Sequence, residues 1–343
     1  MKLKQKTVIC ILICVAISFF VSIPIFYDIA ISFSTPELST LSYKSELLIL
    51  NILASFFTLQ LFYNIYKNFS ISTFGVLLYL TCPYRFYICY DNQDIHFALA
   101  WTIIPLVLAG IFYEYSMAKK RMVCFNIIIT ICAFVTLAYS SFVLLIFTSI
   151  IYFIAIIYYK KPIGILPLFI GYIISVPTFI KYMKILFTSE IANLDFSICS
   201  ITPYRYQFRN FLSSWTYSEH HPGFGLALLL AMFLFIWFLI TEAPKIKEHK
   251  LLFFLYTMLT FILLSATTLW DVAQRIGTPF LRFISLMETP AFCMGFVSLF
   301  ASILSTYAIM QSLKRKTSTI IYSLPCTIAA SALLVFLHLQ FNK

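Results

Sequence analysis

The sequence predicts an all-α membrane protein, a polytopic bundle of about eleven transmembrane helices that forms one integral membrane domain over residues 1–343. Hydrophobic residues make up 61% of the chain and charged residues only 11%, whereas soluble domains carry about 25% charged residues. Apolar runs of roughly 20 residues recur from end to end, and each is long enough to cross the hydrocarbon core as a helix. The sequence shows no alternating apolar and polar segments of the kind that a transmembrane barrel needs.

The predicted helices follow these apolar runs in order. The first run comes directly after the basic start Lys2–Lys6 and lacks a small-residue cleavage site, so it is expected to be retained with the amino terminus inside. The run at 122–138 meets the run at 141–159 with almost no turn, and this pair is expected either to cross fully or to form a partial hairpin. The expected spans are residues 7–27, 46–66, 70–88, 97–115, 122–138, 141–159, 163–183, 223–241, 250–269, 291–311 and 319–340.

The net charge of +11 is explained by membrane topology and requires no nucleic acid partner. Spans that alternate from a cytoplasmic amino terminus place most of the lysines on the inner side, as the positive-inside rule demands. There they also attract anionic lipid headgroups of the surrounding bilayer. The same alternation predicts a plasma membrane protein with an extracytoplasmic carboxyl terminus. Outer loops are then expected at about 28–45, 84–96, 184–222 and 270–290.

Five of the seven arginines fall on the predicted outer side, where the topology rule does not call for basic residues. The planar guanidinium suits phosphate or carboxylate groups, so these arginines are candidates for binding an anionic substrate. The alternative is local ion pairing, for example of Arg85 with Asp91 or Asp94. The five residues are Arg85, Arg205, Arg209, Arg275 and Arg282.

The outer loops combine these arginines with aromatic and titratable residues. The short loop at 84–96 holds Tyr84, Arg85, Asp91, Asp94 and His96 between two apolar runs. The long loop at 184–222 interleaves aromatic residues with arginines, a pattern that suits either the lipid headgroup layer or a surface that stacks sugar rings. The loop at 270–290 carries a short apolar face beside its arginine.

The expected spans contain no charged residue near the middle. Ion-coupled transporters usually need such buried ionisable groups on their pathway. The chemically versatile residues gather instead at the predicted outer surface, which favours an enzyme or binder that works on a lipid-borne substrate. Nine scattered cysteines show no zinc or disulfide spacing, and no cofactor is expected. The use of a metal ion stays open, because Asp91, Asp94 and His96 offer oxygen and nitrogen ligands in an unspecific pattern.

The motif Pro83-Tyr84-Arg85, followed by a span with the core Ile104-Pro105-Leu106, resembles YfhO-like and related GT-C-type polytopic membrane proteins. The stretch Thr278–Pro290 resembles the first half of a later outer segment of that family, but lacks its Trp-Arg end. Such proteins transfer a sugar from a polyprenyl-phosphate donor at the extracytoplasmic face. The resemblance therefore implies a GT-C-like fold and a polyprenyl-phosphate-type lipid as substrate.

The resemblance also implies roles for particular residues. A carboxylate of the first outer loop would act as general base toward the acceptor hydroxyl, and arginines would stabilise the leaving lipid phosphate. The first outer loop is short in this chain, so a shortened or inactive relative is also consistent with the sequence. The candidates are Asp28, Asp91 and Asp94 for catalysis, Arg85, Arg205 and Arg282 for the phosphate, and Tyr84, His96 and Trp215 for the sugar or acceptor.

Two other classes of function remain open at this point. One is a transporter, flippase or polymerase subunit for envelope polysaccharide, which would share the lipid-phosphate substrate class. The other is a membrane protein without catalytic activity that scaffolds a partner. The sequence leaves the sugar, the acceptor and the oligomeric state open.

Overall fold

The computed structural model describes residues 2–27, 41–91, 94–113, 120–187, 223, 225–242, 249–265 and 292–314. Throughout these residues the regular secondary structure is helical, and no strand occurs. Five of the described helices are long and apolar enough to cross a membrane. The chain is therefore an all-α protein with the helices of a membrane protein, as the composition predicts. The number of spans and the GT-C-like arrangement stay predictions.

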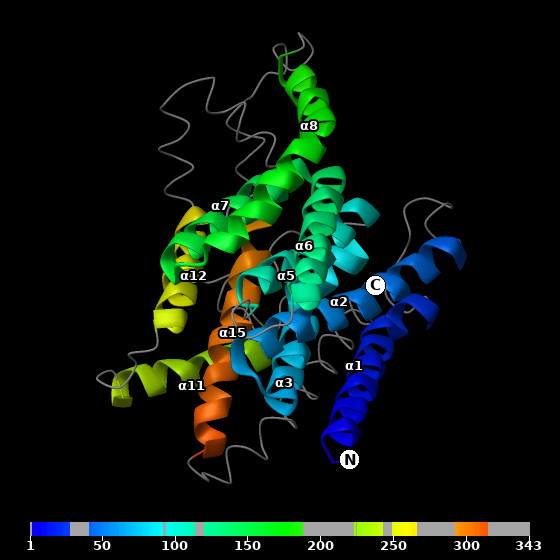
Figure 1. Ribbon diagram of the computed structural model, residues 1–343. Coiled ribbons are helices and arrows are strands. Elements are labelled where there is room, and N and C mark those ends of the chain that lie inside the picture. Colours follow the sequence, from blue (N-terminus) through cyan, green and yellow to red (C-terminus); the bar gives the residue numbers. More distant parts are fainter. Residues whose placement is uncertain are drawn as a thin grey trace.

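The described elements are helices of different lengths (Figure 1). They are α1 (Lys2–Tyr27), α2 (Leu41–Tyr66), α3 (Phe69–Leu80), α4 (Pro83–Phe86), the π-helical turn η2 (Tyr87–Asp91), α5 (Ile95–Ile111), α6 (Lys120–Ser140), α7 (Phe142–Tyr159), the 3₁₀ turn η3 (Pro162–Gly164), α8 (Ile165–Phe187), α11 (Leu226–Glu242), α12 (His249–Ser265) and α15 (Phe292–Lys314). The last expected span, 319–340, lies outside the described residues.

The structure differs from the expected third span, residues 70–88. Helix α3 ends at Leu80, and Cys82 takes an extended conformation with φ −72° and ψ 144° before α4 starts at Pro83. Proline lacks a backbone N–H and disfavours the helical region for the residue before it. The apolar run is therefore broken into α3, α4 and η2.

Helices α6 and α7 are separated by one residue, Ser141, whose hydroxyl accepts a hydrogen bond from the Leu144 N–H at 3.4 Å and so caps α7. Each of the two is long enough to cross a membrane. The abrupt connection that the sequence indicates at residues 139–141 is present in the structure.

Helix α15 lies at the centre of the bundle. Within Cys293–Gln311 on this helix, 94% of a stretch long enough to cross the membrane is buried inside the protein. The corresponding stretches on α6 and α8 are each 28% buried. Helix α15 packs against α12, α11 and α3 (Figure 1). Gly295 permits a close approach of α15 to α5, because a Cβ there would lie 2.1 Å from Cη2 of Trp101 on α5. Small residues at such crossings let membrane helices come together.

Hydrogen bonds show which helix ends lie together. The Asn64 side chain, near the end of α2, donates to the Ala109 carbonyl near the end of α5 at 2.9 Å. The Lys161 ammonium, just after α7, donates to the Ile111 and Tyr113 carbonyls at 2.8 and 3.1 Å. The carboxyl ends of α2, α5 and α7 thus share one end of the bundle.

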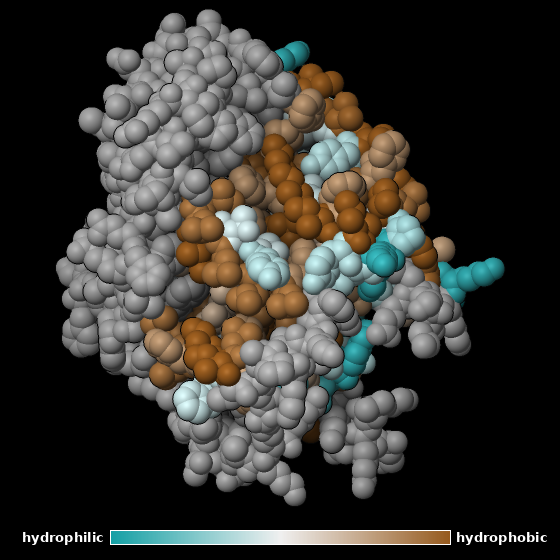
Figure 2. Space-filling view, turned by 90° about the vertical axis from the view of Figure 1, so that its left-hand side faces the viewer, coloured by the Kyte–Doolittle hydropathy of each residue, from teal (hydrophilic) through white to brown (hydrophobic). Residues whose placement is uncertain are grey.

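The start of α11 lies elsewhere, against α4. Gly225 has a φ of 75°, and a Cβ there would lie 2.6 Å from the Pro83 ring. On the face shown in Figure 2, the surface of the described helices is mainly apolar. Large exposed hydrophobic residues such as Phe169, Trp237 and Ile240 contribute to the surface of these helices, which suits a lipid environment.

Candidate functional site

Arg85 is the most unusual residue in the described part of the bundle. Its side chain is only 1% exposed, although the sequence places it in an outer turn. Proline at the first position fixes the start of α4, and the segment then packs inward, with Cys82, Tyr84 and Ile88 also buried. The cation is thereby taken out of water, which is costly for an ion that lacks a counter-charge.

The hydrogen bonds of Arg85 place it at depth. Its Nη2 donates to Asn51 Oδ1 at 3.2 Å and to Thr102 Oγ1 at 3.0 Å. At 1.5 Å per helical residue, Asn51 lies about 12 Å along the candidate span that begins at Tyr43, and Thr102 about 10 Å along α5. Arg85 is not in the middle of a long helix, but its guanidinium reaches residues well inside α2 and α5 because the segment after α3 turns into the bundle.

The rest of the guanidinium has no hydrogen-bond partner among the described residues. Within the described residues, Nε and Nη1 of Arg85 make no hydrogen bond, and no carboxylate pairs with the side chain. Arginine carries five N–H donors, and the two bonds described all come from one nitrogen. A buried cation with donors left over is the arrangement expected of a site that awaits an anion.

Asn51 connects Arg85 to the neighbouring helices. Its Nδ2 donates to Ser22 Oγ on α1 at 3.0 Å, and its backbone carbonyl accepts a hydrogen bond from Ser18 Oγ at 3.3 Å. Thr102 in turn donates to its own helix at the Ala98 carbonyl, at 2.9 Å. We call Ser18, Ser22, Asn51, Arg85 and Thr102 the Arg85 network.

The Cys89 thiol also meets this network, with Sγ 3.5 Å from Asn51 Oδ1. The thiol donates to the amide oxygen and so ties η2 to α2.

Aromatic rings hold the segment in place from the other side. Trp101 is fully buried and meets Tyr84 edge-on, with ring centroids 5.5 Å apart, and Phe296 on α15 at 4.9 Å. These contacts join α4, α5 and α15 next to Arg85. Tyr84, expected to contact a sugar, is thus packed into the core beside the arginine.

The structure does not bring the other described candidates to Arg85. Asp94 is exposed and caps α5, its Oδ1 accepting from the His96 N–H at 2.8 Å. His96 is exposed as well. The Asp91 backbone lies in η2, and its side chain is outside what the structure describes. Asp28, Arg205, Trp215 and Arg282 lie outside the described residues.

Asn51 and Thr102 are the site residues that sequence reasoning missed. The available signal is a polar side chain inside an apolar run, which membrane helices use for contacts between helices. On α2, residues Asn51, Ser55 and Thr58 recur at helical spacing and are all fully buried. Among the described residues, no three His, Cys, Asp or Glu side chains group as a metal site would require.

Comparison with known proteins yields no match: no protein-family model, curated protein or solved structure matches this chain. The resemblance to GT-C-type proteins therefore rests on the sequence motifs alone. What the site can do follows from its geometry, in which the buried guanidinium on α4 bonds to α2 and α5 and keeps donors that no described residue accepts.

Proposed function

We propose that this protein binds the phosphate of a polyprenyl-phosphate-type lipid with Arg85, and that it is a GT-C-like membrane glycosyltransferase. One observation carries the proposal: Arg85 is buried with Nε and Nη1 unbonded among the described residues. A phosphate oxygen accepts charge-assisted hydrogen bonds from both nitrogens, and its negative charge offsets the buried cation. Within a membrane bundle, the natural source of such a group is a lipid.

The proposed reaction is transfer of a sugar from the lipid phosphate to an acceptor hydroxyl. A carboxylate takes the hydroxyl proton as the oxygen attacks the anomeric carbon. The bond from that carbon to the phosphate oxygen breaks, and the lipid phosphate leaves with the electron pair, stabilised by Arg85. The candidate bases stay Asp28, Asp91 and Asp94, and what supports this step is the resemblance of the sequence motifs.

A second function is movement of the same lipid headgroup through the bundle. It is favoured by the buried polar row Asn51, Ser55 and Thr58 on α2, which starts at the partner of Arg85. The Thr58 hydroxyl has no hydrogen-bond partner among the described residues. A row of this kind provides polar contacts along a path.

The direct test is binding of farnesyl phosphate, a soluble polyprenyl-phosphate analogue, to the purified protein in detergent. Arg85→Gln should weaken binding at least tenfold, because charge-assisted hydrogen bonds are worth about 1.5–3 kcal/mol each and about 1.4 kcal/mol corresponds to tenfold. Arg121→Gln removes an exposed arginine at the start of α6 and is the matched control. Unchanged affinity in Arg85→Gln would refute the proposed role.

Two further assays separate the two functions. Glycosyl transfer from a radiolabelled polyprenyl-phosphate sugar that requires Arg85 supports the enzyme. Movement of a fluorescent polyprenyl phosphate across proteoliposomes, without transfer, supports translocation and overturns the enzymatic proposal.

A further inference from the structure

Two helices of membrane length end in the same unusual way. Helix α2 ends at Tyr66 and α7 at Tyr159, and a lysine follows each of them directly. Among the described residues, these two lysines, Lys67 and Lys160, are the only residues other than glycine with a positive φ, at 55° and 52°. Helices commonly end on one residue in this left-handed conformation, and that residue is usually glycine because a Cβ is strained there.

Hydrogen bonds show that both lysines take the place of this glycine. The Lys67 N–H donates to the Tyr63 carbonyl at 2.8 Å, the single bond of a left-handed helix end. The Lys160 N–H donates to the Ile157 carbonyl at 3.2 Å and the next N–H to the Ile156 carbonyl at 3.0 Å, which are the paired bonds of a Schellman motif. Glycine would make the same bonds without the strain of a Cβ. The presence of lysine at both positions therefore calls for a separate reason.

Both lysines lie at the end of the bundle where the carboxyl ends of α2, α5 and α7 meet. Asn64, one turn before Lys67, donates to the Ala109 carbonyl near the end of α5 at 2.9 Å. The residue after Lys160 donates from its ammonium to the Ile111 carbonyl at 2.8 Å. The side chains of Lys67 and Lys160 are both exposed. Two ammonium groups are thus offered to the surroundings at the same end of the bundle.

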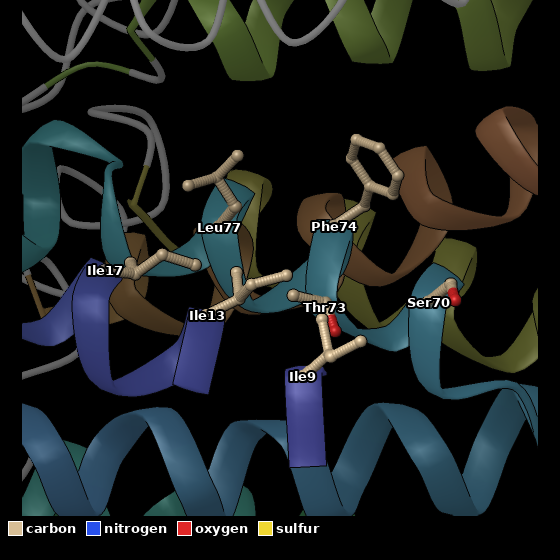
Figure 3. A pocket seen from close by; sticks show the side chains of 7 residues that line it. All are labelled: Ile9, Ile13, Ile17, Ser70, Thr73, Phe74 and Leu77. Atoms are coloured by element: carbon tan, nitrogen blue, oxygen red, sulfur yellow. The ribbon is translucent and has the colours of Figure 1, made fainter. Parts of the chain in front are cut away.

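The neighbours of the two lysines mark the boundary of the hydrocarbon. Tyr66 and Tyr159 end the two helices, and tyrosine is enriched where membrane helices pass from the hydrocarbon into the headgroup layer. Ser70, three residues after Lys67, lies at one end of an apolar groove between α1 and α3 (Figure 3). None of the residues that line this groove is charged. Lys67 and Lys160 therefore lie at the depth of the lipid headgroups.

Membrane topology does not explain the two left-handed conformations. The positive-inside rule concerns lysines near a membrane surface, whatever their backbone conformation. Lys120 meets that need from a regular position at the start of α6, where lysine is a good helix former. Lys67 and Lys160 differ because each places its ammonium directly beyond the last turn of a span.

We propose that Lys67 and Lys160 bind the phosphates of anionic phospholipids in the leaflet at this end of the bundle. The ammonium group is a compact charge with three donors on a flexible stem, which suits a headgroup phosphate. Binding of such a headgroup supplies the reason for which lysine is kept where glycine would be less strained. The end of α2 lies about 22 Å along the helix from Asn51, so this surface is separate from the Arg85 network and does not depend on the proposed function.

The experiment measures binding of dihexanoyl phosphatidylglycerol to the full-length protein in a neutral detergent by calorimetry. Dihexanoyl phosphatidylcholine has the same chains without a net charge, and inorganic phosphate has the charge without the chains. Lys67→Gly and Lys160→Gly remove the two ammonium groups together with the strain. Lys120→Gln is the matched control, because it removes an exposed lysine from a helical position.

We expect the wild type to bind phosphatidylglycerol roughly tenfold more tightly than phosphatidylcholine, because each lysine near the membrane surface contributes about a fivefold factor. Inorganic phosphate should bind more weakly than phosphatidylglycerol, since it lacks chains that hold the headgroup at the micelle surface. Each glycine variant should lose about fivefold in affinity for phosphatidylglycerol, and the double variant should lose most of the preference. Lys120→Gln should bind as the wild type does.

Stability supplies the second measurement. Without lipid, neither glycine variant should melt below the wild type, because relief of the strain offsets the greater freedom of glycine in the unfolded chain. Lys160→Asn should match Lys160→Gly in lipid binding, because asparagine also tolerates the left-handed conformation.

Four results would overturn the proposal. Equal affinity for phosphatidylglycerol and phosphatidylcholine would show that no anionic lipid is selected. An equal loss in Lys120→Gln would reduce the effect to the overall positive charge. Inorganic phosphate that binds as tightly as phosphatidylglycerol would identify a site for free phosphate. A clear fall in the melting temperature of both glycine variants without lipid would show that the lysines serve the helix ends themselves, through the macrodipole.

Discussion

Arg85 combines deep burial with few hydrogen bonds, and this combination bears on stability as well as on binding. The folded protein without ligand carries the desolvation cost of a cation that meets only neutral partners in the described structure. Residues kept for binding often reduce stability in this way. A residue kept for structure would instead stabilise the fold in the absence of any ligand.

Arg85→Gln is therefore expected to leave the melting temperature of the ligand-free protein unchanged or to raise it. Farnesyl phosphate at about 100 times its dissociation constant should stabilise the wild type by about 2.7 kcal/mol and should not stabilise the variant. Thermal unfolding in detergent measures both effects, with Arg121→Gln as the control. A ligand-free Arg85→Gln protein that melts well below the wild type would indicate a structural role.

A substitution at Asn51 can add a negative charge to the same site, whereas Arg85→Gln removes a positive one. Asn51→Asp keeps the shape of the side chain and places a carboxylate where Arg85 Nη2 now meets a neutral oxygen at 3.2 Å. The new ion pair should satisfy the cation and compete with a bound phosphate. We expect phosphate affinity to fall at least tenfold, or by about 1.4 kcal/mol, while the melting temperature does not fall.

Asn51→Ala should behave differently, since it leaves Arg85 and Ser22 with one partner fewer and should cost about 1–3 kcal/mol. Gln60→Glu, at an exposed position on the same helix, is the control for added charge. Phosphate binding by Asn51→Asp at wild-type strength would show that Asn51 does not position the arginine.

At the scale of elements, α15 and α5 meet at one close contact. A Cβ at Gly295 would lie 2.1–2.5 Å from three atoms of the Trp101 indole. The indole is fully buried and meets rings on several sides, so it cannot move aside freely. Gly295→Ala should therefore destabilise the protein by about 1–3 kcal/mol, although alanine favours helix formation.

The measurement is unfolding of Gly295→Ala alone and combined with Trp101→Leu. If the clash is the cause, the two effects should be coupled, and the double variant should be more stable than the sum of the single effects predicts. Gly164→Ala is the control, because its Cβ would lie 3.1 Å from the nearest atom, Cγ1 of Ile156, so a shift of only a few tenths of an ångström relieves the contact. Additive effects would place the cost elsewhere.

The helices could be predicted from the sequence because the length of each apolar run can be read directly and compared with the length that a membrane-spanning helix needs. The break at Cys82 could also be predicted, because Pro83 marks it. The expected span nevertheless continued past it, because the residues on both sides of Pro83 are mostly apolar. The Arg85 network was not within reach. Its members come from α1, α2, α4 and α5, and no local pattern states that Asn51 and Arg85 meet across 34 positions.

For the same reason, the titratable residues of one short loop were expected to act together. In the structure, Arg85 turns into the bundle, whereas Asp94 and His96 lie exposed at the start of α5. Closeness along the chain therefore did not translate into a shared site. The hydrogen-bond partners of Arg85, Asn51 and Thr102, depend instead on how the helices pack against one another.

At the scale of the whole molecule, helices that run in alternating directions place their ends on two opposite sides of the bundle. The carboxyl ends of α5 and α7 meet through Lys161, and the first residues of α6 follow closely on α5. His96 lies at the opposite end of α5. The distribution of lysines in the sequence predicts that the Lys161 end faces the cytoplasm.

Single cysteines at Lys120 and His96 test this orientation. Both positions are exposed, one at the start of α6 and the other at the start of α5. A membrane-impermeant maleimide should label His96→Cys in intact expressing cells and Lys120→Cys only in inverted vesicles, each measured against the labelling of the native cysteines. Because a helix of 17 residues separates the two ends of α5, labelling of both from one side would mean that α5 does not cross. The reverse pattern would place the site end of the bundle in the cytoplasm, where a lipid phosphate would have to enter from the inner leaflet.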